Sequence, residues 1–105
     1  MEKSENVKKA IDAVEAEMRC AGIWSDQPLE PERYQFTQAF GMDTMAFSQW
    51  VQFILVPRVR SIIESGGGFP AASQVGAQAV REFDGVDEAQ GLVSALCEFD
   101  RVVEE

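Results

Sequence analysis

The sequence predicts an all-α protein, a four-helix bundle with a long aromatic-rich connection between its first and second helices. Apolar residues recur at steps of three and four over several segments, which is the repeat of one helix face. No segment shows sustained period-two alternation bounded by hairpin turns, so a sheet has no candidate strands. The 105 residues are 46% hydrophobic and 26% charged. This is the composition of one ordinary globular domain, and we expect residues 1–105 to fold as a single unit.

The first helix is predicted over residues 4–22. Its apolar stripe consists of Val7, Ala10, Ile11, Val14, Met18 and Ala21. Ser4 is the expected N-cap, because its hydroxyl can accept a hydrogen bond from a first-turn N–H. Gly22 is expected to end the helix, because glycine adopts the left-handed conformation readily.

The second helix is predicted over residues 46–64 and should be central, because it is apolar around most of its circumference. Its apolar residues are Phe47, Trp50, Val51, Phe53, Ile54, Leu55, Val56, Val59, Ile62 and Ile63. Asp43 or Thr44 is expected to cap its start, and the glycines at 66–68 should stop it. Pro57 lies inside this segment. Its missing N–H and the clash of its ring with the preceding turn predict a kink.

Two more helices are predicted over residues 73–83 and 87–104. The shorter one would bury Val75, Ala79, Val80 and Phe83, and the Asp84–Gly85 pair would end it. The longer one carries a stripe made of Ala89, Leu92, Val93, Leu96, Phe99 and Val103. Asp87 is its expected N-cap. Trp50, Phe53, Ile54, Leu96 and Val14 are expected in the common core.

The connection over residues 23–42 is too long for an idle linker and too apolar for a disordered one. It contains Ile23, Trp24, Leu29, Tyr34, Phe36 and Phe40. We expect it to cross the bundle and complete the core, as buried aromatic residues usually do. The alternative is that it walls a groove for a ligand or partner. The candidate groove residues are Trp24, Tyr34, Phe36, Phe40 and Arg58.

Arg58 falls within the apolar arc of the second helix, where an unpaired guanidinium would be costly. Asp100 occupies the equivalent place on the last helix. A partly buried ion pair between the two is the predicted arrangement, and it would fix the register of the two helices. The alternative is that Arg58 faces the groove and binds an anion.

The charge balance opposes direct nucleic-acid binding. Nine Lys and Arg stand against eighteen Asp and Glu, for a net charge of -9. Such a surface repels phosphate backbones. Residues 82–105 hold eight acids against Arg101 alone, a net -7. That end either meets a basic partner protein or serves only as a soluble surface.

The sequence contains few of the residues and spacings that catalysis and metal binding commonly use. It contains no histidine, which is the commonest general base and metal ligand. Cys20 and Cys97 stand 77 positions apart, without redox or zinc spacing, and are predicted to be free thiols. We therefore predict no metal and no cofactor. Gly66–Gly68 is a turn and not a phosphate loop, since no G-K-[ST] follows it.

Membrane insertion is also not expected. The opening residues lack an apolar targeting segment, and the longest unbroken apolar run is the five residues 53–57. A span needs about 20 such residues. The sequence therefore predicts a cytoplasmic protein.

Two segments carry a resemblance to a known family. FGMDTMAFSQWVQFILVPRV from Phe40 onward, followed by GGGFP, resembles the signature of the YqcC-like family of small bacterial proteins. The matching positions are Phe40, Met42, Asp43, Thr44, Met45, Gln49 or a neighbour, Trp50, Pro57 and Arg58, and the Phe69–Pro70 pair belongs to a weaker similarity over nearly the whole chain. Weaker similarity includes Phe36, Thr37, Gln38, Phe99 and Asp100. The resemblance implies a compact helical bundle without an established biochemical activity, associated by name with tRNA pseudouridine synthase C.

Three functions follow as hypotheses. The first is a small non-catalytic protein-interaction module with an unidentified partner, which also leaves a homo-oligomer open. The second is an accessory, or less readily a catalytic, component of tRNA pseudouridylation. In the catalytic case Asp43 would be the nucleophile, since it lies in the best-matching motif. The third is a small-ligand carrier that uses the aromatic groove.

Overall fold

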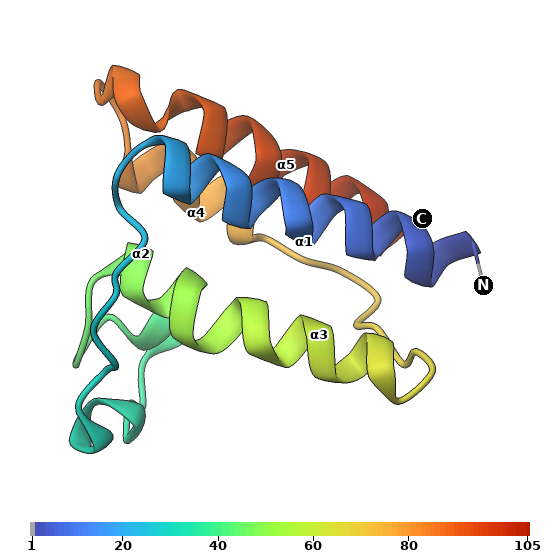
Figure 1. Cartoon of the computed structure of the whole chain (residues 1–105), viewed down its shortest axis with the longest axis horizontal. Helices are drawn as coiled ribbons and strands as arrows, with labels where there is room; N and C mark the ends of the chain where they lie inside the picture. The colour runs from blue at the N-terminus through green and yellow to red at the C-terminus, as the bar shows by residue number, and fades with distance from the viewer. Residues whose placement is uncertain (1) are drawn as a thin grey trace.

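The computed structural model describes residues 2–105, and it is all-helical with no strand over that range. Two long helices are α1 (Glu2–Cys20) and α5 (Gln90–Glu104). A third helical rod joins α2 (Phe47–Trp50), the π-helical turn η3 (Val51–Leu55) and α3 (Val56–Glu64). Figure 1 shows α1 running antiparallel to both the rod and α5, with α4 (Val75–Glu82) packed against α5. The predicted all-α bundle is confirmed.

Helix α1 buries the stripe that its sequence predicts. Val7, Ile11, Val14 and Met18 are fully buried. Gly22 has a φ of +73°, and the N–H of Ile23 donates to the carbonyl of Met18 at 3.0 Å, which closes the helix end. The prediction for Ser4 is wrong: the helix already starts at Glu2, so Ser4 lies in its first turn and not at its cap.

The central rod begins at Phe47 and is capped by a different group from the one predicted. Ala46 is the N-cap, and its N–H donates to the Gln49 side chain at 2.9 Å. Asp43 and Thr44 lie too far before the first turn to reach its N–H groups, so their predicted capping role is wrong.

Pro57 is accommodated by a local change of helix type. The turn over Val51–Leu55 is π-helical, and the N–H of Val56 donates to the carbonyl of Val51. A single π-helical turn within an α-helix is one of the known local changes that accompany an interrupted hydrogen-bond ladder. The structure thus has a π-helical turn before Pro57, and the kink predicted at Pro57 itself stays a prediction. Trp50 and Ile54 are buried as expected, whereas Phe53 is half-buried.

The connection between α1 and α2 packs on the bundle. It contains two short 3-10 turns, Pro31–Tyr34 and Ala39–Gly41. Leu29 is buried in the core, and the Phe40 ring meets the Trp50 ring edge-on with centroids 5.1 Å apart. Phe40 holds a φ of +58°, which is uncommon for a residue other than glycine. Its ring packs edge-on against the rings of Trp50 and Phe47.

The last helical segment starts without the side-chain cap that its sequence predicts. Asp87 begins a 3-10 turn, Asp87–Ala89, and makes no capping hydrogen bond, so its predicted role is wrong. The Gln90 side-chain amide instead donates to the carbonyls of Phe83 and Val86, in the turn that follows α4. Leu96 and Phe99 of α5 are buried, as the stripe predicts.

Within the described chain, no helix is long and apolar enough to cross a lipid bilayer. Cys20 and Cys97 are both exposed free thiols, as predicted.

Candidate functional site

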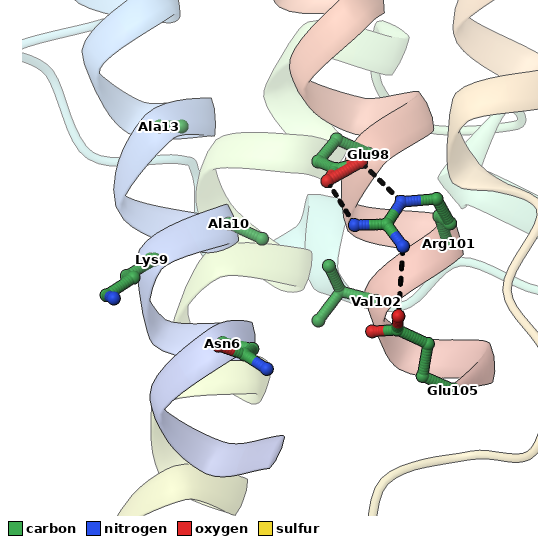
Figure 2. Close-up of a pocket in the computed structure, with 8 residues that line it drawn as sticks. All are labelled: Asn6, Lys9, Ala10, Ala13, Glu98, Arg101, Val102 and Glu105. Carbon is green, nitrogen blue, oxygen red and sulfur yellow. Dashed lines mark hydrogen bonds and ion pairs between the residues drawn. The ribbon is translucent and has the colours of Figure 1, made fainter. Parts of the chain in front are cut away.

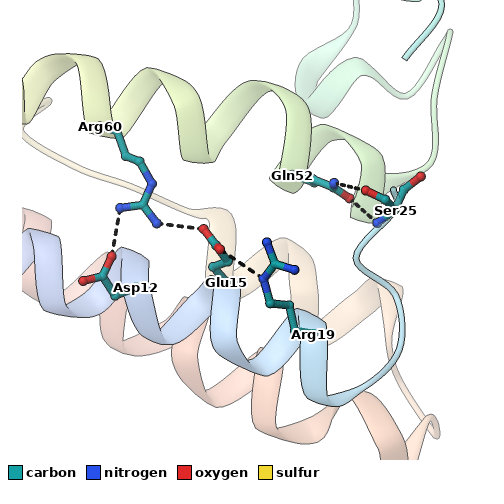
Figure 3. Close-up of polar contacts among 6 residues, drawn as sticks. All are labelled: Asp12, Glu15, Arg19, Ser25, Gln52 and Arg60. Carbon is teal, nitrogen blue, oxygen red and sulfur yellow. Dashed lines mark hydrogen bonds and ion pairs between the residues drawn. The ribbon is translucent and has the colours of Figure 1, made fainter. Parts of the chain in front are cut away.

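The main polar link across the bundle joins α1 to α3. Arg60 donates to Asp12 at 2.8 Å and to Glu15 at 2.9 Å, and Glu15 also accepts from Arg19 at 3.1 Å (Figure 3). Sequence reasoning missed this network. The available signal was that Asp12 and Glu15 lie three residues apart beside the buried stripe, on a face able to meet another helix.

The carboxylates of this network are held ionised. Hydrogen bonds from Arg60 and then Lys8 lower the pKa of Asp12 below its usual value. Partial burial acts to raise the pKa of Glu15, but hydrogen bonds from Arg60 and Arg19 outweigh it, so its pKa is also lowered. Since all these groups keep substantial solvent contact, the network orients α1 against α3 more than it stabilises the fold.

Gln52 is the buried polar side chain of the rod. Its side-chain oxygen accepts from the N–H of Ser25, and its amide nitrogen donates to the carbonyl of Ser25, both at 2.8 Å (Figure 3). In these two hydrogen bonds the Gln52 amide pairs with the Ser25 backbone as two backbones pair in a sheet, and they join the connection to the rod.

Asp43 is exposed, and its carboxylate links two parts of the connection between α1 and α2 through hydrogen bonds. Its carboxylate accepts from the N–H and hydroxyl of Thr37, both at 3.0 Å, and from the N–H of Gln38 at 3.3 Å. The backbone hydrogen bond from Thr37 is the main cause that lowers the pKa of Asp43. Thr44 completes the loop through reciprocal hydrogen bonds with Arg33. The carboxylate has no enclosing pocket of the kind a nucleophile needs.

Asp100 caps α4 from the neighbouring helix. Its Oδ1 accepts from the N–H of Val75 at 3.1 Å and from the Ser73 hydroxyl, and its Oδ2 accepts from the N–H of Gly76 at 2.7 Å. The predicted ion pair with Arg58 is wrong: Arg58 is exposed and Asp100 faces the start of α4. The unpaired N–H groups of a helix start attract a carboxylate, whichever element supplies it.

The five candidate groove residues do not line one groove. The Trp24 ring lies against the guanidinium of Arg19, 4.6 Å from ring centroid to Cζ, and Tyr34 is 45% exposed. Phe36 and Phe40 pack on the core. Arg58 instead lines a pocket of about 230 Å³ that contains none of the other four.

A wider hollow of about 340 Å³ lies between α1 and α5. In Figure 2 its α5 side is a chain of charges, in which Arg101 binds Glu98 and Glu105. Its α1 side is formed by Asn6, Lys9, Ala10 and Ala13. The hydrogen bond from Arg101 lowers the pKa of Glu98. With its acids already paired, this hollow offers few free groups to a ligand.

The turn between α4 and α5 presents the densest unpaired charge. We call Glu82, Asp84, Asp87 and Glu88 the acidic turn; all four are exposed, and none makes a side-chain hydrogen bond or ion pair within residues 2–105. Val86, in the middle of this segment, is 40% exposed. An exposed apolar residue among unpaired acids suits contact with a basic protein surface.

We next consider metal-ligating clusters and unpaired buried polar atoms among the described residues. No three His, Cys, Asp or Glu side chains converge as metal ligands between residues 2 and 105. Every buried side-chain nitrogen and oxygen in that range has a hydrogen-bond partner, so the interior leaves no polar atom aimed at a missing group.

The fold and these surfaces define a small, acidic, all-helical bundle. The chain belongs to the family described as tRNA pseudouridine synthase C (DUF446), whose model matches residues 6–102. Its fold is similar to the solution NMR structure of protein YqcC from Escherichia coli, with a TM-score of 0.84 and 24% identity, covering 100% of this chain and 91% of that one.

Three curated relatives place the family in bacteria. An uncharacterized protein of Haemophilus influenzae is 28% identical, over 85% of this chain and 84% of that protein. The uncharacterized protein YqcC of Escherichia coli is 31% identical, over 68% of this chain and 65% of that protein. The tRNA pseudouridine synthase C of Pectobacterium carotovorum is 27% identical over 67% of this chain, but only 19% of its own length is matched.

Proposed function

We propose that this chain is a non-catalytic protein-interaction module that serves a tRNA pseudouridine synthase in the cytoplasm. The observation that carries the proposal is the Pectobacterium relative, a protein named as that enzyme, in which the matched stretch is 19% of the length. The matched stretch is thus a minor part of a much longer polypeptide bearing the enzyme's name. A module that forms part of a protein with this name in one bacterium is a candidate to contact the same enzyme in another.

The geometry supports a binding role over a catalytic one. The synthase reaction needs a positioned carboxylate in an enclosed site that holds an extruded uridine. The Asp43 carboxylate is exposed and accepts three hydrogen bonds from its own loop. The net charge of -9 also opposes RNA, so the synthase would have to supply the contacts to the tRNA.

The acidic turn is the proposed contact surface. A protein that binds tRNA carries basic surface, and unpaired acids steer association with such a surface. The exposed Val86 would add apolar contact at the centre of the patch.

The test is to mix the purified chain with the tRNA pseudouridine synthase C of the same cell and measure complex mass by light scattering. We expect a stoichiometric complex that weakens as salt rises. Glu82→Lys with Asp84→Lys should weaken it at least tenfold, while Glu30→Lys with Glu32→Lys changes the charge equally, on exposed residues elsewhere, and should leave it intact.

An activity assay distinguishes the alternatives. The isolated chain should form no pseudouridine in unmodified tRNA. Turnover by the chain alone that disappears in a folded Asp43→Asn variant would overturn the proposal in favour of catalysis. Absence of any complex with the synthase at micromolar concentration would overturn the interaction itself.

A further inference from the structure

A second pocket, distinct from the acidic turn, lies between α3, the segment 65–74 and α5. Its volume is about 230 Å³. Trp50, Phe69 and Phe99 supply aromatic walls, and Val59 and Val103 add aliphatic ones. Polar atoms enter the lining through Ser73 and Gln74. A small concave site with mostly apolar walls and a few polar groups is the usual form of a small-molecule site.

Arg58 is the one ionisable side chain among the described residues that line this pocket. It is exposed, and it takes part in no ion pair or side-chain hydrogen bond within residues 2–105, whereas Arg60, two residues later, binds two carboxylates. An unpaired guanidinium beside an apolar wall is suited to a ligand that carries one anionic group next to an apolar body. Its planar fork matches the geometry of a carboxylate.

The acidic side chains next to this pocket already contact other groups of the protein. Asp100 accepts from the Ser73 hydroxyl and from two N–H groups at the start of α4. An oxygen of Glu104 lies 3.5 Å from the Ser73 nitrogen. These acids, together with the net charge of -9, disfavour a ligand with several negative charges. They favour a monoanion whose charge is placed at Arg58.

We propose that this pocket binds a monocarboxylate with a compact apolar body, the body lying against Trp50, Phe69 and Phe99 and the carboxylate pairing with Arg58. Filled at the packing density of protein interiors, 230 Å³ holds a body with a van der Waals volume of roughly 170 Å³. That is the size of a medium-chain acid or of one acylated amino acid. This site does not depend on the proposed role with a synthase.

A free acid and the C-terminal residue of a polypeptide share this chemistry, so two probes separate the sources. Sodium octanoate represents the free acid, and N-acetylleucinate represents a chain terminus. Octan-1-ol supplies the apolar body without charge, and acetate supplies the charge without the body. Binding is followed by calorimetry and by the fluorescence of Trp50 in a Trp24→Phe background, since Trp50 lines the pocket.

Two pairs of variants test the site. Arg58→Gln removes the proposed charge, and Arg81→Gln removes the charge of another exposed arginine, on α4, as its control. Ala72→Phe fills the pocket, since Ala72 lines it, and Ala71→Phe places the same ring on an exposed residue outside the lining. All four positions are exposed, so the variants should fold.

We expect one of the two carboxylates to bind saturably in roughly the millimolar range, as suits a ligand of this size. Arg58→Gln and Ala72→Phe should each weaken it at least tenfold, while the two controls leave it within twofold. The tighter probe identifies the source of the carboxylate. Failure of both probes to saturate, or equal binding of octanoate and octan-1-ol that is insensitive to Arg58→Gln, would overturn the proposal.

Discussion

Arg60 and Asp12, 48 positions apart in the chain, are joined by an ion pair of 2.8 Å that fixes α3 against α1. Glu15 receives the second nitrogen of the same guanidinium at 2.9 Å. The pairing sets the rotation of the two helices about their own axes, because both acids lie on one face of α1.

Replacing Arg60 by Gln should lower the free energy of unfolding by about 1 kcal/mol at neutral pH, since each of its two partly exposed pairs contributes less than that. The carboxyl pKa values of Asp12 and Glu15 are lowered in the folded state. Their contribution is therefore complete above the unfolded values of 3.8 and 4.5, and it is lost as the pH falls through the lower folded values.

The difference between wild type and Arg60→Gln should thus shrink as the pH falls below about 4. Urea unfolding at a series of pH values measures it, with Arg81→Gln as the control, since Arg81 is exposed and takes part in no ion pair within residues 2–105. A constant difference down to pH 2 would contradict the role assigned to these pairs.

Asp100→Ala should destabilise the protein by about 1 to 3 kcal/mol, because it strands the N–H groups of Val75 and Gly76 at the start of α4. Arg58→Ala should cost little, and the double variant should equal the sum of the singles. Thermal unfolding of the four proteins completes this cycle. A coupling energy of more than about 1 kcal/mol between Arg58 and Asp100 would instead indicate that these two side chains form an ion pair.

Gly76→Ala should also destabilise the protein, by about 1 to 3 kcal/mol, because of close helix packing. A Cβ at Gly76 would lie 2.6 Å from Cα of Cys97 on α5, and backbone cannot move aside easily. Gly91→Ala is the matched substitution, since its Cβ would meet only the flexible end of Glu17. It should stabilise α5 by about 0.5 to 1 kcal/mol, and equal effects of the two changes would be inconsistent with this packing.

Gln52→Leu should loosen the connection without unfolding the bundle. The change removes both hydrogen bonds to Ser25 and leaves the Ser25 backbone groups unpaired, at about 1 to 3 kcal/mol. Limited proteolysis should then cut within residues 21–46 faster than in wild type. Gln49→Leu, which removes a cap of α2 instead, serves as the comparison and should leave that cleavage rate nearer to wild type.

Asp43→Asn should raise the hydrogen exchange rate of the Thr37 and Gln38 amides, which donate to this carboxylate. The lowered pKa of Asp43 predicts the same loosening in wild type when the pH falls below the ordinary range of an aspartate. Exchange measured by mass spectrometry at matched chemical rates tests both statements. Unchanged protection in Asp43→Asn would show that other contacts hold the loop.

The sequence by itself determined the all-α class, the buried stripe of α1 and the end of α1 at Gly22. Each of these depends on residues within one or two helical turns, where periodicity and backbone conformation are local properties. The free state of Cys20 and Cys97 was likewise readable from their spacing.

Only the tertiary structure decided which partners the polar side chains take. Asp100 caps α4, Arg60 pairs with Asp12 on α1, and the Gln52 side chain hydrogen-bonds to the Ser25 backbone. Arg58 lines a pocket, but none of the predicted groove residues Trp24, Tyr34, Phe36 and Phe40 lines it. These outcomes depend on the rotation and axial offset of packed helices. Side-chain periodicity states which face of a helix is buried, but it does not state which residue of a neighbouring helix lies opposite. The residues that form the candidate sites therefore could not be predicted from the sequence alone.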